Sequence, residues 1–203
     1  MQEINWLKKP FFWLFLVLIL VWVAIWQFPK DEKLKIVFCD VGQGDAALIT
    51  YKSKQILVDG GPNNQVLDCL QTHLPFWDKE IEMVISTHPD ADHLTGLIDV
   101  IERYVVSHFL INSKGKDSGV FAAFQDAVLE EGGLVYFPEK GDQVSLGPLK
   151  LVFLWPEDQD QVLGATTLER EANETSVVFT LSFGEFEALV SGRHFLLKPE
   201  ALD

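Results

Sequence analysis

Apolar residues are concentrated in one uninterrupted run near the beginning of the chain. The 20 residues 10–29 contain no charged side chain and lie between Lys9 and Lys30. A helix rises 1.5 Å per residue, so a run of this length reaches about 30 Å, the thickness of the hydrocarbon core of a bilayer. The pattern predicts a single-pass membrane anchor over residues 10–29, after a short stub (1–9) and before a linker (30–35). Tryptophans stand toward the ends of the run, as is typical of membrane interfaces, namely Trp13, Trp22 and Trp26.

Two other interpretations of this run stay open, a buried core helix and a cleaved signal peptide. Cleavage is disfavoured because the bulky residues 25–28 stand where a signal peptidase needs small side chains. Lysines flank the run on both sides, so the positive-inside rule does not decide its orientation; they are Lys8, Lys9, Lys30, Lys33 and Lys35. We expect the stub inside and the following domain, residues 36–203, on the extracytoplasmic side.

After the run, the pattern changes to short strands and helices. Apolar residues spaced three and four apart predict helices at 62–73, 93–104 and 120–131. Short apolar or alternating runs predict strands at Leu34–Cys39, Ala47–Tyr51, Gln55–Val58, Glu82–Ser86, Val105–Ile111, Leu134–Phe137, Gln143–Leu146, Leu149–Leu154, Ser176–Ser182 and Glu187–Val190. Strands that occur both in runs and between helices predict an α/β (or α+β) sandwich of sheets flanked by helices.

Composition narrows the class of protein. The 203 residues are 48% apolar and 23% charged, which is room for one globular domain beside the anchor. A formal net charge of −14 excludes a broad basic surface for nucleic acid, so any such contact has to be local. The two cysteines, Cys39 and Cys69, have no CxxC spacing. We interpret them as two buried thiols in preference to a single disulfide.

Candidate chemistry is concentrated in residues 86–96, STHPDADHLTG. Four metal-ligand residue types stand within six positions, after a predicted strand and at the start of a predicted helix: His88, Asp90, Asp92 and His93. Alternate residues of an extended loop point the same way, so His88 and Asp90 can share one ion while Asp92 and His93 face a second. Mixed imidazole and carboxylate ligands suit zinc or manganese. The alternative is a solvated turn with an N-capping Asp.

On these residues, the sequence resembles the metallo-β-lactamase superfamily, in the HxDxDH form of the extracytoplasmic C-terminal domain of ComEC-type competence proteins. The resemblance runs from about residue 35 to 192 and also rests on 38–49 (FCDVGQGDAALI), 56–62 (ILVDGGP) and 173–178 (NETSVV). It implies an αβ/βα sandwich with a site for one or two divalent ions. It further implies hydrolysis of nucleic-acid phosphodiesters outside the membrane, with single-stranded DNA as the substrate in DNA uptake. No protein partner is evident from the sequence.

Five further residues are candidates for binding substrate or supporting the ligands. Gln43 and Asp45 belong to a Gly-rich turn that brings them near a pocket or simply forms a hairpin turn. Asp59 could orient a ligand histidine or cap a turn. Asn173 and Ser176 could donate hydrogen bonds to a substrate phosphate, or only open a strand.

Two classes of function stay open. In the first, an enzyme, water activated by metal attacks phosphorus or a carbonyl carbon, and Asp92 is the catalytic residue that orients this water. A DNA phosphodiester is the expected substrate, and an ester outside nucleic acid stays open.

The second class is a binding module or an impaired remnant. Gly192 is followed by Arg193, where the resemblance implies a carboxylate that bridges two metals. The residues that follow are too few for a further helix and strand, so we expect a truncated chain. Such a chain would have an incomplete second half of the sandwich, weak metal affinity and little hydrolysis.

Overall fold

The computed structural model describes residues 10–27, 32–112, 118–157, 176–192 and 194–197. The chain divides into two compact units, residues 1–32 and 33–203, and each is described by itself. In the first unit, helix α1 (Pro10–Gln27) covers most of the uncharged run, with side chains described as far as Val23. Within the described ranges, no helix combines the length and the apolar character that crossing a membrane requires.

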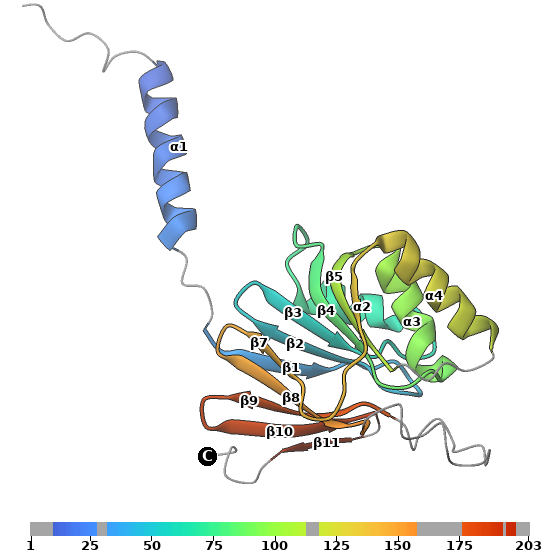
Figure 1. The fold of residues 1–203 in the computed structure, drawn as a ribbon. Coiled ribbons are helices and arrows are strands. Elements are labelled where there is room, and N and C mark those ends of the chain that lie inside the picture. Colours follow the sequence, from blue (N-terminus) through green and yellow to red (C-terminus); the bar gives the residue numbers. More distant parts are fainter. Residues whose placement is uncertain (1–9, 28–31, 113–117, 158–175, 193, 198–203) are drawn as a thin grey trace, which may run out of the picture. The chain divides into compact units, whose positions relative to one another are not determined.

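The second unit contains two sheets packed face to face, with helices on one outer side (Figure 1). The first sheet has six strands in the order β1-β2-β3-β4-β5-β6. The pairs β1·β2 and β2·β3 are antiparallel, and β3 to β6 pair in parallel. All strands except β2 therefore run in one direction and end at the same edge. Their bounds are β1 Leu34–Phe38, β2 Ala47–Tyr51, β3 Lys54–Val58, β4 Glu80–Ser86, β5 Val105–Ile111 and β6 Leu134–Tyr136.

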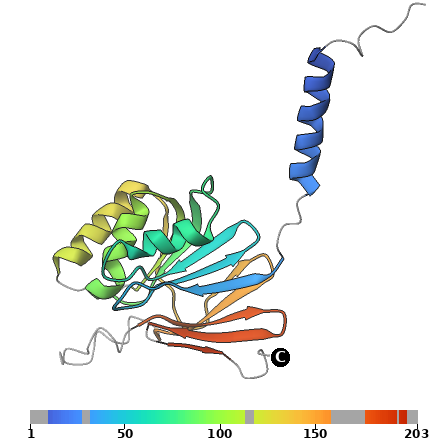
Figure 2. The same cartoon turned by 180° about the vertical axis from the view of Figure 1, so that it is seen from behind.

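Three helices cover the outer face of the first sheet, as both views show (Figures 1 and 2). They are α2 (Gln65–His73), α3 (Ala91–Ile101) and α4 (Gly119–Glu131). Each turns apolar residues toward the sheet, and Leu70, Leu97 and Phe124 are fully buried there. The central strands lie between these helices and the second sheet. This position explains why β4 is buried at every residue after Glu80 rather than at alternate residues.

The second sheet is antiparallel, in the order β11-β10-β9-β8-β7. Ile49 and Ile85 of the first sheet share a buried cluster with Phe153 and Phe179 of the second. The predicted α/β sandwich is confirmed, with layers in the order helices, sheet, sheet. Among the described residues of the second unit, no helix lies on the outer face of the second sheet (Figure 2). The bounds are β7 Gln143–Leu146, β8 Leu149–Trp155, β9 Val178–Phe183, β10 Phe186–Ser191 and β11 His194–Leu197.

Two expectations are corrected by the fold. Cys39 and Cys69 form a disulfide with their Cα atoms 5.6 Å apart, so the interpretation as two thiols is wrong. Cys39 follows β1 and Cys69 lies on α2, which meet only because α2 packs on the sheet; no local spacing signals the pair. The residues after Gly192, which we expected to be too few for a further helix and strand, do contribute one strand, β11, at the edge of the second sheet.

Candidate metal centre

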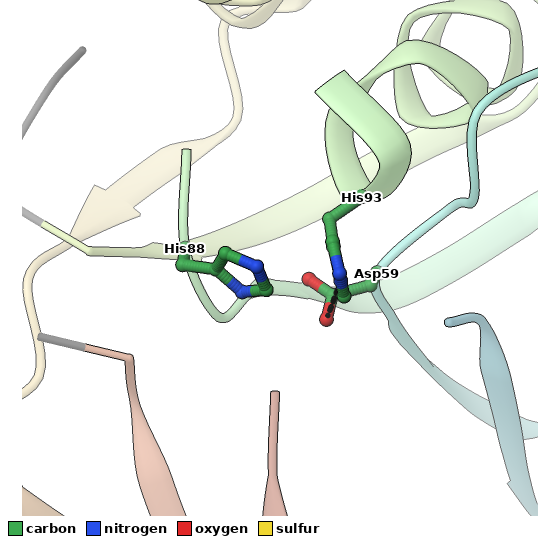
Figure 3. A group of neighbouring side chains, drawn as sticks. All are labelled: Asp59, His88 and His93. Carbon is green, nitrogen blue, oxygen red and sulfur yellow. Dashed lines mark hydrogen bonds and ion pairs between the residues drawn. The ribbon is translucent and has the colours of Figure 1, made fainter. Parts of the chain in front are cut away.

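Asp59, His88 and His93 meet where the strands of the first sheet end (Figure 3). Asp59 directly follows β3, His88 follows β4 by two residues, and His93 lies in the first turn of α3. Their side chains are buried, with exposed fractions of 1%, 1% and 3%. One ligand-type atom from each lies within 4.8 Å of the others, an arrangement that could hold a metal ion.

Close backbone contacts hold the loops that carry these residues. The Gly60 N–H donates to the His93 carbonyl over 2.8 Å. A Cβ at Gly60 would lie 2.4 Å from the Leu97 nitrogen, and one at Gly44 would lie 2.0 Å from the Asp92 carbonyl oxygen. Real Cβ atoms do not approach so closely, so glycine is required at both positions. The Gly-rich turn is therefore packed directly on the HPDADH motif.

A chain of hydrogen bonds connects the two histidines through Thr87 and Asp59. Thr87 donates twice to the Asp59 carboxylate, from its hydroxyl over 2.6 Å and from its backbone N–H over 2.8 Å. The His93 Nδ1 lies 3.0 Å from the same carboxylate, which only accepts, so Nδ1–H is the donor. The Thr87 proton is already used, so its oxygen accepts from His88 Nδ1 at 2.9 Å. Both imidazoles thus carry their proton on Nδ1 and present the Nε2 lone pair.

Asp59 is held behind the histidines rather than presented to an ion. Its backbone has φ 56°, a left-handed conformation that Asp tolerates better than most residues. Its carboxylate accepts three hydrogen bonds, two from Thr87 and one from His93. An aspartate that accepts from the Nδ1–H of a ligand histidine fixes the ring orientation and makes Nε2 a stronger donor. The geometry therefore gives Asp59 an orienting position.

The surroundings shift the pKa values of the two histidines in opposite directions. Burial and then repulsion from His93, whose ring centroid is 3.8 Å away, lower the pKa of His88. Burial also lowers the pKa of His93, but the hydrogen bond to Asp59 and the charges of Asp59, Asp92 and Asp45 outweigh it. The pKa of His93 is consequently raised above its ordinary value of 6.5.

Each Nε2 faces a carboxylate of the motif. His88 Nε2 lies 3.7 Å from Asp90 Oδ2, and His93 Nε2 lies 3.8 Å from Asp92 Oδ2. These separations are too long for hydrogen bonds. Two ligand atoms that each lie about 2.1 Å from one tetrahedral ion are about 3.4 Å apart. The nitrogen and oxygen of each pair are therefore a few tenths of an ångström farther apart than two ligands of one ion. Asp90 is the N-cap residue of α3: its backbone carbonyl accepts from the Leu94 N–H over 3.0 Å, whereas its side chain makes no capping hydrogen bond. The donor set fits a divalent metal ion.

The other residues predicted for the site differ in how closely the structure places them to this centre. Gln43 and Asp45 are both exposed on the Gly-rich turn, and the backbone carbonyl of Asp45 accepts from the Gly61 N–H over 3.1 Å. Ser176 is buried and precedes Val177, whose N–H donates to the Thr87 carbonyl over 2.8 Å. Asn173 lies outside the described residues.

Gly192 also contacts the centre, because a Cβ placed there would lie 2.8 Å from His88 Nδ1. Arg193, the next residue in the sequence, lies outside the described residues. Thr87 and Asn112 were not identified from the sequence. Asn112 donates from Nδ2 to the Thr87 carbonyl over 3.2 Å. The position of Thr87 between the strand and the HPDADH motif could have indicated a residue of the site, but nothing in the local sequence shows which way its hydroxyl points.

Helices on one side of two packed sheets, with paired imidazoles and carboxylates where the strands end, define a fold of the metallo-hydrolase kind. The model of the metallo-β-lactamase superfamily matches residues 39–192, and the chain belongs to this superfamily. The sequence matches no curated protein.

Solved structures of the same fold come from several bacteria. YhfI from Bacillus subtilis, a metallo-β-lactamase fold protein, is 15% identical with a TM-score of 0.51, over 77% of this chain and 60% of that one. A metallo-β-lactamase of Cronobacter sakazakii with a HARLDQ motif is 13% identical with a TM-score of 0.53, over 76% and 57%. Zn²⁺-bound PqqB from Methylobacterium extorquens is 15% identical with a TM-score of 0.51, over 71% and 51%. The chain thus spans between half and three fifths of these proteins, and likeness at this identity shows the fold alone.

Proposed function

We propose that this protein is a metal-dependent hydrolase that cleaves phosphodiester bonds of DNA outside the membrane, as its resemblance to ComEC-type proteins implies. The observation that supports the proposal best is the pair of open imidazole–carboxylate sites, His88 with Asp90 and His93 with Asp92. Both Nε2 atoms are turned toward these sites by one buried network, so the ligands are oriented before any ion binds.

The residues around the pairs have distinct roles in this proposal. A divalent ion, zinc or manganese, would supply a water of lowered pKa and neutralise charge on a phosphoryl oxygen. Asp92 is about half exposed at its side chain, so it can reach this water, accept its proton and orient it for attack. Asp59 and Thr87 are buried and hold the imidazoles without contacting substrate. Five aspartates and no lysine or arginine lie in the loops 39–46, 59–64 and 87–92, so an anionic substrate depends on the metal for its attraction.

We place the domain outside the membrane, tethered by residues 10–29. The uncharged run supports this tether, and its side chains from Phe11 to Leu18 are largely exposed on α1, which water does not favour. The Cys39–Cys69 disulfide supports an oxidising compartment, because disulfides are rare in a reducing cytosol.

A binding module with an impaired site is the second candidate, and one observation favours it. Gly192 touches His88, and the residue that follows it is Arg193 rather than a carboxylate. A cation in place of a carboxylate at this point of the sequence would oppose metal binding and leave each ion with few protein ligands. In this case the site holds phosphate or metal weakly and turns over little.

One experiment separates these functions. The full chain is purified in detergent, its zinc and manganese contents are measured, and cleavage of a labelled single-stranded DNA and of a small phosphodiester is followed with and without added manganese. His88→Ala removes a proposed ligand, and the exposed His73→Ala is its matched control. Metal-dependent cleavage lost only in His88→Ala supports the hydrolase, and stoichiometric metal without cleavage supports the binding module. Equal metal content in both variants would contradict both.

A further inference from the structure

The loop 74–79 between α2 and β4, here called the aromatic tip, exposes two large adjacent aromatic side chains. Phe76 is 82% and Trp77 is 73% exposed, and their rings pack edge to face with centroids 4.9 Å apart. Scattered exposed apolar residues are normal on a protein surface, but a preformed aromatic pair at a loop tip is a binding feature. Trp in particular prefers the boundary between lipid and water.

The topology places this tip at the edge of the sheet where the chain enters β1. The strands β1, β3, β4 and β5 run in one direction, so the aromatic tip before β4 shares an edge with Leu34, the first residue of β1. The metal pairs lie at the opposite edge, where these strands end. We call the edge where the strands begin the tether edge and the edge where they end the metal edge. The chain from Gln27 at the end of α1 to Leu34 is seven residues long, a reach of about 25 Å at most. A bilayer that holds residues 10–29 is therefore within reach of this edge.

The two edges also differ in charge. Six of the eight lysines and arginines that the structure describes in residues 32–203 lie at the tether edge: Lys33, Lys35, Lys52, Lys54, Lys79 and Arg103. Acidic residues accompany them, and Glu82 pairs with Lys54 at 2.8 Å, so this edge is mixed in charge. The loops at the metal edge carry aspartates instead. An anionic lipid surface therefore repels the metal edge more strongly than the mixed first edge, within about a Debye length.

We propose that the tether edge, led by Phe76 and Trp77, docks on a lipid bilayer containing anionic lipid and turns the metal centre away from the membrane. The proposal rests on the proposed anchor at residues 10–29. Three further exposed apolar side chains lie along this edge and extend the surface that lipid would cover, namely Val105, Leu129 and Leu134. Docking would leave the substrate to approach from the aqueous side.

The test uses the full chain reconstituted in vesicles of phosphatidylcholine with about one third phosphatidylglycerol. Both natural cysteines are in the disulfide, so a nitroxide can be attached to a single introduced thiol. Phe76→Cys reports on the aromatic tip, and Glu139→Cys, beyond the end of β6, is the control at the opposite edge. Electron paramagnetic resonance then measures collisions with oxygen, which concentrates in lipid, and with a water-soluble nickel chelate.

We expect the label at position 76 to lose several-fold in chelate collisions and to gain in oxygen collisions relative to detergent, while the label at 139 changes little. Vesicle flotation reports the anchor separately. If the chain floats but the label at 76 stays accessible to the chelate, docking is refuted and the anchor stands. If the chain does not float, the anchor and docking both fall, whereas the metal assay of the proposed hydrolase is unaffected. Protection of position 76 from both reagents would mean a protein contact, such as a second copy, and would also overturn lipid docking.

Discussion

Replacing Asp59 by Asn tests the orienting network with a change of very few atoms. Asn keeps the volume of Asp and also tolerates the left-handed backbone at φ 56°. The Asn side-chain oxygen can still accept a hydrogen bond from the Thr87 N–H. Its NH2 group, which is a donor, then faces His93 Nδ1 in place of a carboxylate oxygen, which is an acceptor. The favourable response is for His93 to move its proton to Nε2, which removes the lone pair that an ion needs.

The expected magnitudes follow from the three hydrogen bonds that Asp59 accepts while only 1% exposed. A buried hydrogen bond to a charged group contributes about 1.5–3 kcal/mol, and Asn retains part of the set, so we expect a loss of about 2–3 kcal/mol in the free energy of unfolding. For a domain of this size that lowers Tm by about 5–10 °C. Metal affinity should fall by about 10–100-fold, as is usual when the partner of a ligand histidine is lost.

Three measurements on the full chain test whether Asp59 orients His93. Thermal unfolding in chelator gives the stability of the metal-free protein, competition with a chromophoric chelator gives the metal affinity, and the ¹⁵N shifts of the imidazoles give the tautomers. Asp126→Asn, an exposed change on α4, is the control and should leave all three unchanged. If Asp59→Asn keeps full metal affinity and leaves the proton of His93 on Nδ1, the assignment of an orienting role to Asp59 is wrong.

Further predictions follow from the same geometry. Since the pKa of His93 is raised above 6.5, its proton stabilises the metal-free fold, and that stabilisation is lost as pH rises through the folded pKa. Metal affinity should rise over the same window because Nε2 is released, as titrations upward from pH 6.5 would check. Substituting His88 by Ala should weaken metal binding by more than about 100-fold, whereas His108→Ala, whose ring bonds to the Glu82 carbonyl, should not change the metal content. Breaking the Cys39–Cys69 disulfide, which closes a separation of 30 residues, should cost about 3–4 kcal/mol in urea unfolding. Replacing Arg193 by Asp should increase metal affinity about 10-fold by removing a like charge; unchanged affinity would show that residue 193 does not reach the pairs.

Much of the fold could be predicted because its signals are local. The strands and helices of residues 34–191 were found within one to three residues of their ends. Burial on both faces gives β4 its consecutive apolar residues 83–85, and one-sided burial gives the helices their spacing. Helix α3 begins at Ala91 rather than at His93, because Pro89 excludes helix before it but Asp90 can already serve as its N-cap. The four motif residues lie within six positions, so their proximity also needed no knowledge of the fold.

What could not be predicted depends on contacts between distant segments. Cys39 and Cys69 meet only through the packing of α2, and the strand β11 exists because β10 offers it a hydrogen-bonding edge. The hydroxyl of Thr87 acquires its direction from Asp59, which is 28 residues away. Secondary-structure propensity and residue spacing carry no information about such contacts, because they form only when the helices and the two sheets pack together.

The network at the metal edge implies that the metal is not needed to fold this domain. Structural zinc sites often fold only with their ion, because their ligands have no other partners. Here each Nδ1 and both carboxylate oxygens of Asp59 already have partners within the protein. Among the buried side-chain atoms of the described residues, only Gln55 Oε1 lacks a hydrogen bond, and it lies at the other end of β3. The ion would therefore bind to a site that is already formed. A change that weakens metal binding through Asp92, whose side chain is 53% exposed, should leave the metal-free stability almost unchanged, unlike a change at Asp59.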